Sequence, residues 1–216
     1  MQISKRKLMS NILIIDTANA KLSLALLAKE NIVGQYLDAS DYSHARNITL
    51  EIEKMLSSNS MKISNLDAVA VNEGPGSFTG LRVGSSIAKG ICFGLEIPLI
   101  KINGLEAYAK YFYKALEGKY QDIFILLDAR RDNYFFAHSS MGEIQTQTTF
   151  LHIDEIEKKI NESLSTWVYN SKNEGEVKLQ ATFLAEEVLN KWKNKDFEDI
   201  SSFEPQYLLN NYQAKK

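Results

Sequence analysis

Residues 73–84, EGPGSFTGLRVG, form a glycine-rich run that indicates the fold of this chain more clearly than any other stretch. An apolar run at residues 66–71 precedes it, and a long apolar segment from 78 to 95 follows it. A short apolar run bounded by turn residues is typical of a buried strand, whereas an apolar segment of this length is typical of a helix. The run therefore predicts a strand that passes into a helix through a tight turn.

The turn itself is predicted from residue chemistry. Gly74, Pro75 and Gly76 are the residue types that tight turns require. The helix that follows needs an oxygen to accept hydrogen bonds from its first free amides, and either Ser77 or Thr79 can supply it. Neither a P-loop nor a dinucleotide-binding fingerprint is present, because no Gly-Lys-Ser/Thr follows and the glycine spacing is one residue too long.

Small residues recur along the predicted helix every four positions, at Gly80, Gly84 and Ala88. Glycine costs about 1 kcal/mol relative to alanine inside a helix, so their presence calls for a compensating contact. We favour close packing over ligand binding. The neighbour is expected to be the chain's own first helix, a helix of a partner subunit, or both.

The elements around this run follow one order in the N-terminal half: three strands, a helix, a strand, a helix and a strand. The expected strands are 11–17, 21–29, 32–37, 66–71 and 98–102, and the first helix carries Ile48, Ile52, Met55 and Leu56 on one face. This is the element order of a ribonuclease H-like lobe.

The C-terminal half repeats the pattern in part. The expected elements are helices at 105–116, 153–160 and 181–192 and strands at 122–128, 133–139, 144–150 and 166–169. A clear final strand is missing. We predict an α/β fold with two ribonuclease H-like halves of the actin/hexokinase type, the second truncated. The expected division is a flexible tail at 1–10, lobes at 11–104 and 105–203, and a C-terminal tail at 204–216.

Composition narrows the function classes. The chain of 216 residues has a formal net charge of −2, from 25 basic and 27 acidic residues, which argues against a stand-alone nucleic-acid binder. Cys92 is the only cysteine, so neither an intramolecular disulfide nor a cysteine-based zinc site is expected. No segment approaches the roughly 18 apolar residues of a membrane helix, and we expect a cytoplasmic protein without membrane contact.

The run at 74–84, GPGSFTGLRVG, together with AKG at 88–90, resembles the motif of the TsaB family, formerly called YeaZ. Other segments resemble the family in the same order. They are Ile14–Thr17, Ser43-His44, Leu66–Val71, Asp128-Ala129-Arg130 and Pro205-x-Tyr207-Leu208. Leu209 stands where many members have arginine. The resemblance is tight over residues 11–109 and sparse but collinear afterwards.

The resemblance implies a non-catalytic scaffold subunit. Such a subunit binds the catalytic paralogue TsaD through first-lobe helices and, with the ATPase TsaE, supports threonylcarbamoylation of the adenosine beside the anticodon of tRNA. We expect tRNA contact only through the complex, a homodimer through the same helices when the partner is missing, and no cofactor or metal. The candidate partner interface comprises Ile48, Ile52, Gly80, Leu81, Gly84 and Ala88. The candidate structural motif comprises Asp16, Thr17, Gly74, Pro75, Gly76, Ser77, Thr79 and Arg82.

Residues that the catalytic relatives need are replaced here. The TsaD family carries a His-x-x-x-His metal pair shortly after the strand that follows the glycine-rich helix, and Gly104 and Tyr108 stand at those positions. Of the remaining candidates, Cys92 is expected to be a small buried hydrophobe. His138 and His152 are expected to be surface or capping residues, and His44 a structural or interface residue.

Enzyme alternatives remain open at this point. A ribonuclease H-like nuclease would use Asp16, Glu51 and Glu73 around two divalent ions. The competing interpretation of Asp16 is a turn carboxylate that accepts backbone amides. A glycoprotease-type hydrolase lacks its metal pair, and a sugar or acetate kinase-like enzyme lacks the second-half glycines.

Overall fold

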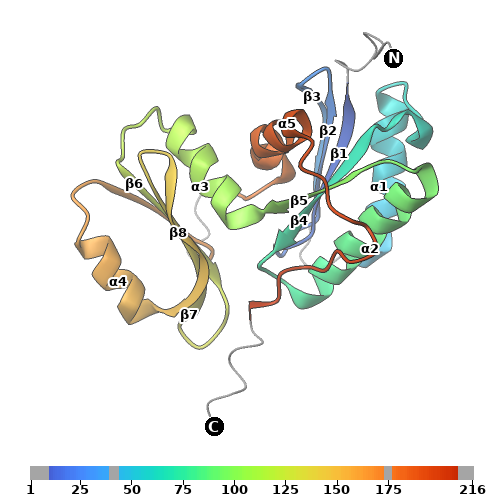
Figure 1. Cartoon of the computed structure of the whole chain (residues 1–216). Coiled ribbons are helices and arrows are strands. Elements are labelled where there is room, and N and C mark those ends of the chain that lie inside the picture. The colour runs from blue at the N-terminus through green and yellow to red at the C-terminus, as the bar shows by residue number, and fades with distance from the viewer. Residues whose placement is uncertain (1–9, 39–43, 173–176, 209–216) are drawn as a thin grey trace. The chain divides into compact units, whose positions relative to one another are not determined.

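The computed structural model describes residues 10–38, 44–172 and 177–208, and the chain in it divides into two compact units. The first unit contains residues up to 73, residues 77–102 and residues 180–205. The second contains residues 74–76, residues 103–179 and the C-terminal residues from 206. Figure 1 labels their helices and strands.

The first unit is built on a five-stranded sheet with the order β3-β2-β1-β4-β5. The strands are β1 (Asn11–Asp16), β2 (Ser23–Ala28), β3 (Asn31–Leu37), β4 (Ala68–Gly74) and β5 (Leu99–Asn103). The first three form an antiparallel meander, and β4 pairs with β1 in parallel. Because β1 lies in the middle of the sheet and is covered on both faces, it reads as an unbroken apolar run.

Helices cover both faces of this sheet (Figure 1). On one face, α1 (His44–Ser58) and α2 (Phe78–Leu95) pack on the strands, and a short 3₁₀ turn, η2 (Ile63–Asn65), follows α1. On the other face lie η3 (Ala181–Leu184) and α5 (Ala185–Asn194). The apolar core under α1 and α2 combines strand residues such as Leu13 and Ile15 with Ile48, Ile52 and Cys92.

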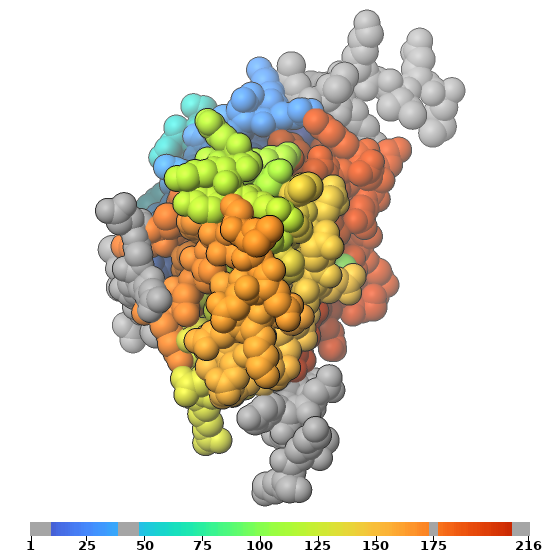
Figure 2. Space-filling model, turned by 90° about the vertical axis from the view of Figure 1, so that its left-hand side faces the viewer, coloured from blue at the N-terminus to red at the C-terminus, as the bar shows by residue number. Residues whose placement is uncertain are grey.

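The second unit has a four-stranded sheet with the order β8-β7-β6-β9. Its strands are β6 (Asp122–Asp128), β7 (Asn133–Ser140), β8 (Glu143–His152) and β9 (Thr166–Asn170), and its helices are α3 (Gly104–Ala115) and α4 (Ile153–Asn161). Two antiparallel pairings are followed by a parallel one, which repeats the β3-β2-β1-β4 pattern of the first unit. Figure 2 shows α4, in orange, on the outer surface of this unit.

The mixed α/β fold with two sheets confirms the predicted class, and α2 and β6 have the predicted bounds. Residues 180–205 belong to the first unit. The prediction assigned residues 105–203 to the second lobe, so the division differs at this segment. The reason is burial: Ala181 and Leu184 are fully buried at the first sheet, and the Ala181 amide donates to the Ser23 hydroxyl at 2.9 Å.

Parts of the predicted tails, Ser43 and Leu209 lie outside the described residues. Within the residues that are described, no helix is both long enough and apolar enough to cross a bilayer.

Candidate functional site

The glycine-rich turn connects β4 to α2 as the sequence predicts. Gly74 is the last residue of β4, its backbone has a φ of 113°, and the Gly74–Pro75 peptide is cis. The Ser77 hydroxyl accepts a hydrogen bond from the Gly80 amide at 3.2 Å, and the Ser77 amide donates to the carbonyl of Ala18 at 2.8 Å. Ser77 is therefore the cap of α2, whereas Thr79 lies exposed in the first turn.

The two buried glycines of α2 pack against the end of the central strand. A Cβ atom on Gly80 would lie 2.0 Å from the carbonyl oxygen of Thr17, and one on Gly84 would lie 2.2 Å from the Thr17 hydroxyl. That hydroxyl donates to the Gly80 carbonyl at 2.7 Å. The close neighbour of these two glycines is thus Thr17 of the same chain, while Ala88 lies in the core that α1 shares, as predicted for the first helix.

Asp16 is a turn carboxylate. It is fully buried and accepts hydrogen bonds from the Ala18 amide at 3.1 Å and from the side chains of Asn19 at 3.1 Å and Asn72 at 2.9 Å. Three amide donors hold this carboxylate, and they shape the corner that receives α2. Asp16 therefore fits the structural interpretation.

The other two residues of the nuclease hypothesis have basic partners. Glu51 pairs with Lys54 at 2.8 Å, and Glu73 faces Lys101 at 3.9 Å. Among the described residues, no three His, Cys, Asp or Glu side chains gather to hold a metal ion. The arrangement does not favour a two-metal nuclease.

The six residues predicted as a partner interface all lie in the interior of the first unit. The four larger residues are 3% exposed or less and both glycines are buried; the six are Ile48, Ile52, Gly80, Leu81, Gly84 and Ala88. This placement corrects the prediction, because periodicity identified the apolar face of each helix and that face packs on the sheet. A partner that docks on α2 has to contact its opposite face, whereas on α1 it can reach Ile52 through a groove that this residue lines.

The opposite face of α2 is unusual for a solvent-facing helix. Phe93 is 79% exposed and Phe78 51% exposed, and the guanidinium of Arg82 lies over the Phe78 ring, 3.9 Å from its centroid. Gly90 and Gly94 lie beside Phe93, and a Cβ atom on either would meet no atom within 4 Å. Nothing in the described part of the chain therefore requires glycine at these two positions, although each costs helix stability.

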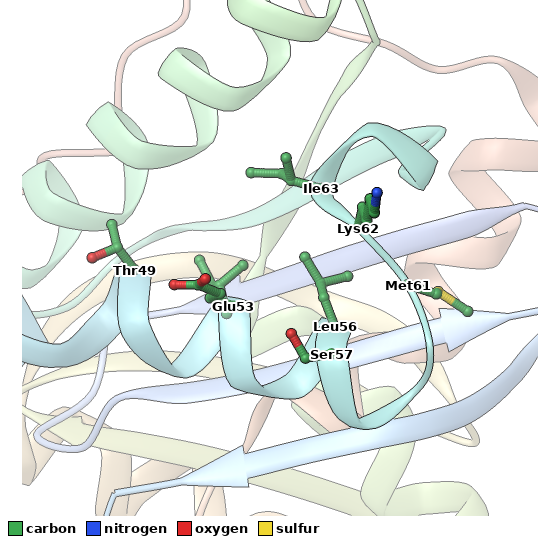
Figure 3. Close-up of a pocket in the computed structure, with 8 residues that line it drawn as sticks. Thr49, Glu53, Leu56, Ser57, Met61, Lys62 and Ile63 are labelled. Atoms are coloured by element: carbon green, nitrogen blue, oxygen red, sulfur yellow. The ribbon is translucent and has the colours of Figure 1, made fainter.

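A groove runs along α1 and the turn that follows it (Figure 3). It has a volume of about 350 Å³. Its lining residues are Thr49, Ile52, Glu53, Leu56, Ser57, Met61, Lys62 and Ile63. The inner wall is apolar, Glu53 and Lys62 lie at the rim, and Ile63 is 45% exposed. We name the groove and the exposed residues Leu50, Phe78, Arg82, Gly90, Phe93 and Gly94 the outer helical face.

The histidines of the second unit have local partners. His152 caps α4, because its Nδ1 accepts from the Asp154 amide at 3.3 Å, as predicted. His138 is neither a surface nor a capping residue: its Nε2 lies 2.9 Å from Asp122, and its ring stacks on Phe124 with centroids 4.4 Å apart. Burial alone would raise the pKa of Asp122, but hydrogen bonds from Ser163, His138 and Ser140 lower it below its usual value.

Two further positions agree with the sequence. Cys92 is fully buried, which raises the pKa of its thiol to about 11, so it is the small hydrophobe that was predicted. Gly104 begins α3 and Tyr108 is completely buried in it, so no imidazole stands at either position.

The five-stranded β3-β2-β1-β4-β5 sheet with helices on both faces, and the repeat of its first four strands in the second unit, define an α/β protein of the ribonuclease H-like class. Two solved structures from Pseudomonas aeruginosa share the whole fold. One is YeaZ and the other is a protein described as similar to peptidase YeaZ. They superpose with TM-scores of 0.76 and 0.77 at 20% identity, over 93% of this chain and 100% of theirs.

The model of the TsaD family, tRNA N6-adenosine threonylcarbamoyltransferase, matches residues 38–204. Three curated relatives are tRNA threonylcarbamoyladenosine biosynthesis proteins TsaB. Those of Haemophilus influenzae and Bacillus subtilis are 31% identical over 126 residues, which is 58% and 57% of this chain, and that of Escherichia coli is 29% identical over 132 residues, 61% of this chain. The chain covers 52%, 52% and 56% of their lengths, so it spans about half of the curated relatives it matches. The chain belongs to the TsaD family, as a member of its TsaB (YeaZ) group.

Proposed function

We propose that this chain is a non-catalytic scaffold subunit in the formation of threonylcarbamoyladenosine in tRNA. It binds TsaD through the outer helical face and acts with TsaE, and it contacts tRNA only within that complex, in the cytoplasm. The observation that carries the proposal is this face, where Phe93 and two unconstrained helix glycines lie side by side.

The outer helical face has the chemistry of a helix-docking surface. At Gly90 and Gly94 a partner helix can approach the backbone of α2 closely, because no side chain stands in the way. Such a helix would cover Phe93, and full burial of a phenylalanine side chain contributes about 1.5–3 kcal/mol. The groove on α1 offers an apolar wall of Ile52, Leu56 and Met61 to one side chain of the partner.

One residue of the first unit and two of the second support a scaffold rather than an enzyme. Asp16 at the end of the central strand is held by three amide donors and shapes the corner that receives α2. Gly104 and Tyr108 stand at the positions of the catalytic relatives' histidines. We also propose that the second unit is a shortened copy of the first, since its sheet repeats four of the five strands. Its contribution is to extend the surface of the subunit.

Reconstitution tests the function. TsaD, TsaE, tRNA, ATP and threonylcarbamoyl-adenylate are combined with and without this chain, and modified adenosine is measured. We expect product only when the chain is present and none from the chain alone. Equal product without the chain would reject the scaffold role.

A matched pair of variants tests the surface. Phe93→Ala removes the exposed ring from the outer helical face, whereas Leu164→Ala removes a side chain that is 100% exposed in the second unit. We expect the first change to weaken TsaD binding and the second to leave it unchanged. Sedimentation of the chain alone then tests the proposed homodimer, which Phe93→Ala should shift toward monomer.

A further inference from the structure

The turn between β6 and β7 has an unusual backbone. Three consecutive residues, none of them glycine, lie in the left-handed region: Arg130 with φ 73°, Arg131 with φ 51° and Asp132 with φ 58°. This conformation costs roughly 1–2 kcal/mol at each of the two arginines, whereas aspartate adopts it more readily. A conformation of this kind persists only where surrounding groups hold it, and such strain concentrates at functional sites.

Polar side chains hold this turn from both strands. Asp128 accepts from the Arg130 amide at 3.0 Å. Asn133, which is only 8% exposed, donates to the carbonyls of Arg131 at 2.8 Å and Arg130 at 3.4 Å. The turn is therefore fixed before any ligand arrives.

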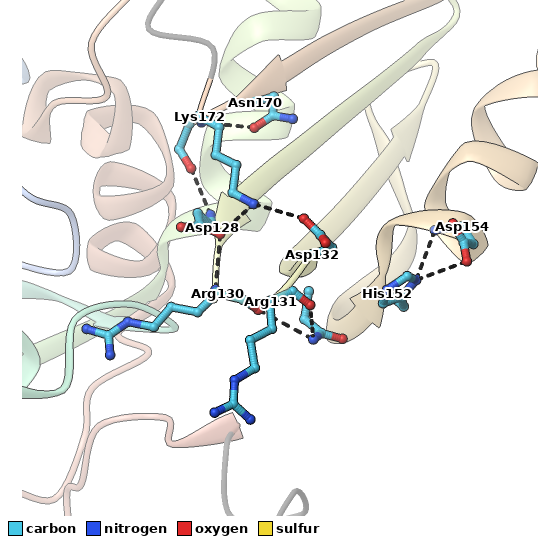
Figure 4. A network of polar contacts seen from close by, with 10 residues as sticks. Asp128, Arg130, Arg131, Asp132, His152, Asp154, Asn170 and Lys172 are labelled. Atoms are coloured by element: carbon cyan, nitrogen blue, oxygen red, sulfur yellow. Dashed lines mark hydrogen bonds and ion pairs between the residues drawn. The ribbon is translucent and has the colours of Figure 1, made fainter.

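Lys172, which follows the end of β9, contacts both aspartates of the turn. Its ammonium group lies 3.3 Å from Asp128 and 3.5 Å from Asp132 (Figure 4). It also lies 5.0 Å from the centre of the Tyr134 ring. Lys172 offsets one of the two carboxylate charges, so the turn with its two arginines keeps a net positive charge.

The fixed turn presents two guanidinium groups to solvent. Arg130 and Arg131 are both exposed, and their side chains extend away from the turn and diverge from each other (Figure 4). Within the part of the chain that the structure describes, no carboxylate forms an ion pair with either group. Three cations stand here against two carboxylates, in a chain whose net charge is −2.

We propose that the arginine turn, residues 128–133, binds phosphate groups of tRNA when the chain is part of its modification complex. The inference rests on the proposed function. A guanidinium fork matches the oxygens of a phosphate group, and a preformed turn loses little entropy when it binds. Two diverging forks suit neighbouring phosphates of one RNA strand better than one small anion. The contact positions the RNA and reads no base.

A double substitution with a charge-matched control tests the proposal. Arg130→Ala/Arg131→Ala removes both guanidinium groups, and Lys158→Ala/Lys159→Ala removes two exposed cations of α4. The affinity of the complex with TsaD for tRNA is measured across a range of salt concentrations. Two lost phosphate contacts should weaken binding about tenfold and reduce the salt slope by roughly 1.4–1.8, and the control should change neither. Arg130→Lys/Arg131→Lys keeps the two charges but lacks the forked guanidinium groups. Its tRNA affinity should lie between that of the double alanine variant and that of the unmodified chain.

The outcomes separate the alternatives. If the double variant forms an intact complex whose tRNA affinity and salt slope are unchanged, the proposal that the arginine turn binds phosphate is rejected, and the proposed scaffold function stands. Loss of TsaD or TsaE binding in the double variant overturns it in favour of a protein contact. Loss of ATP affinity with tRNA binding retained overturns it in favour of a nucleotide. Failure of the unmodified chain to bind TsaD at all rejects the proposed function and this inference together. Thermal unfolding of each variant confirms that it is folded.

Discussion

Two glycines of α2, six residues apart, should respond in opposite ways to the same substitution. In Gly84→Ala the new methyl group would lie 2.2 Å from the Thr17 hydroxyl, which itself donates to the Gly80 carbonyl at 2.7 Å. Overpacking typically costs roughly 1–3 kcal/mol, and disturbing the hydrogen bond costs about 1 kcal/mol. The higher helix propensity of alanine offsets about 1 kcal/mol of this loss. We expect a net destabilisation of about 2 kcal/mol. In Gly90→Ala the methyl group meets nothing within 4 Å, so we expect a gain of about 1 kcal/mol.

Urea unfolding of both variants measures this difference of about 3 kcal/mol, and for a chain of this size each kcal/mol also shifts the melting temperature by roughly 2–4 °C. The double variant Gly84→Ala/Thr17→Ala identifies the cause. Removing the hydroxyl should make the loss smaller than the sum of the two single losses. A Gly84→Ala variant as stable as the unmodified chain would refute the close contact, and additive losses would show that Thr17 is not the residue that excludes the methyl group.

Three further results are expected from the same framework. Phe93→Ala should weaken TsaD binding about ten- to a hundredfold by calorimetry while the free chain keeps its unfolding midpoint, because this ring is 79% exposed before docking. Asp16→Asn should destabilise the chain by about 1–3 kcal/mol, since it disturbs a buried acceptor of three amide donors, and magnesium-dependent RNA cleavage that disappears with this change would contradict the scaffold role. The folded-state pKa of Asp122 is lowered from the usual 3.8, so its contribution to stability is present above that pH and is lost as the pH falls through the lower folded value. Asp122→Asn should flatten the acid limb of the pH–stability curve, and an unchanged limb would show that its hydrogen bonds do not favour the ionised form.

Local patterns were sufficient for the elements of this fold. The bounds of α2 follow from a serine cap and a continuous apolar segment, and β6 follows from an apolar run between aspartates. Both signals lie within a few residues of the element that they define. The same holds for His152, whose capping role depends on an amide only two residues away.

Contacts between distant residues could not be derived in this way. The apolar periodicity of α1 and α2 identified the face that packs on the sheet, so Ile48 and Leu81, predicted at an interface, lie in the core of the first unit. The neighbour of Gly84 is Thr17, which lies far away in sequence. The left-handed turn at Arg130 contains no glycine, and it is held by Lys172 from another strand, so no local signal predicts it.

The return of residues 180–205 to the first sheet makes the first unit discontinuous in sequence, whereas the bulk of the second unit, 103–179, is contiguous. During synthesis, the second unit can therefore complete its fold while the first still lacks the segment that covers one face of its sheet. Until Ala181 and Leu184 emerge, the apolar strand residues Ile12 and Ile14 have no cover from η3. A chain cut after Leu179 would keep the contiguous unit intact and expose the central strand of the other. Residues 180–205 thus close a unit whose strands are all made before the second unit.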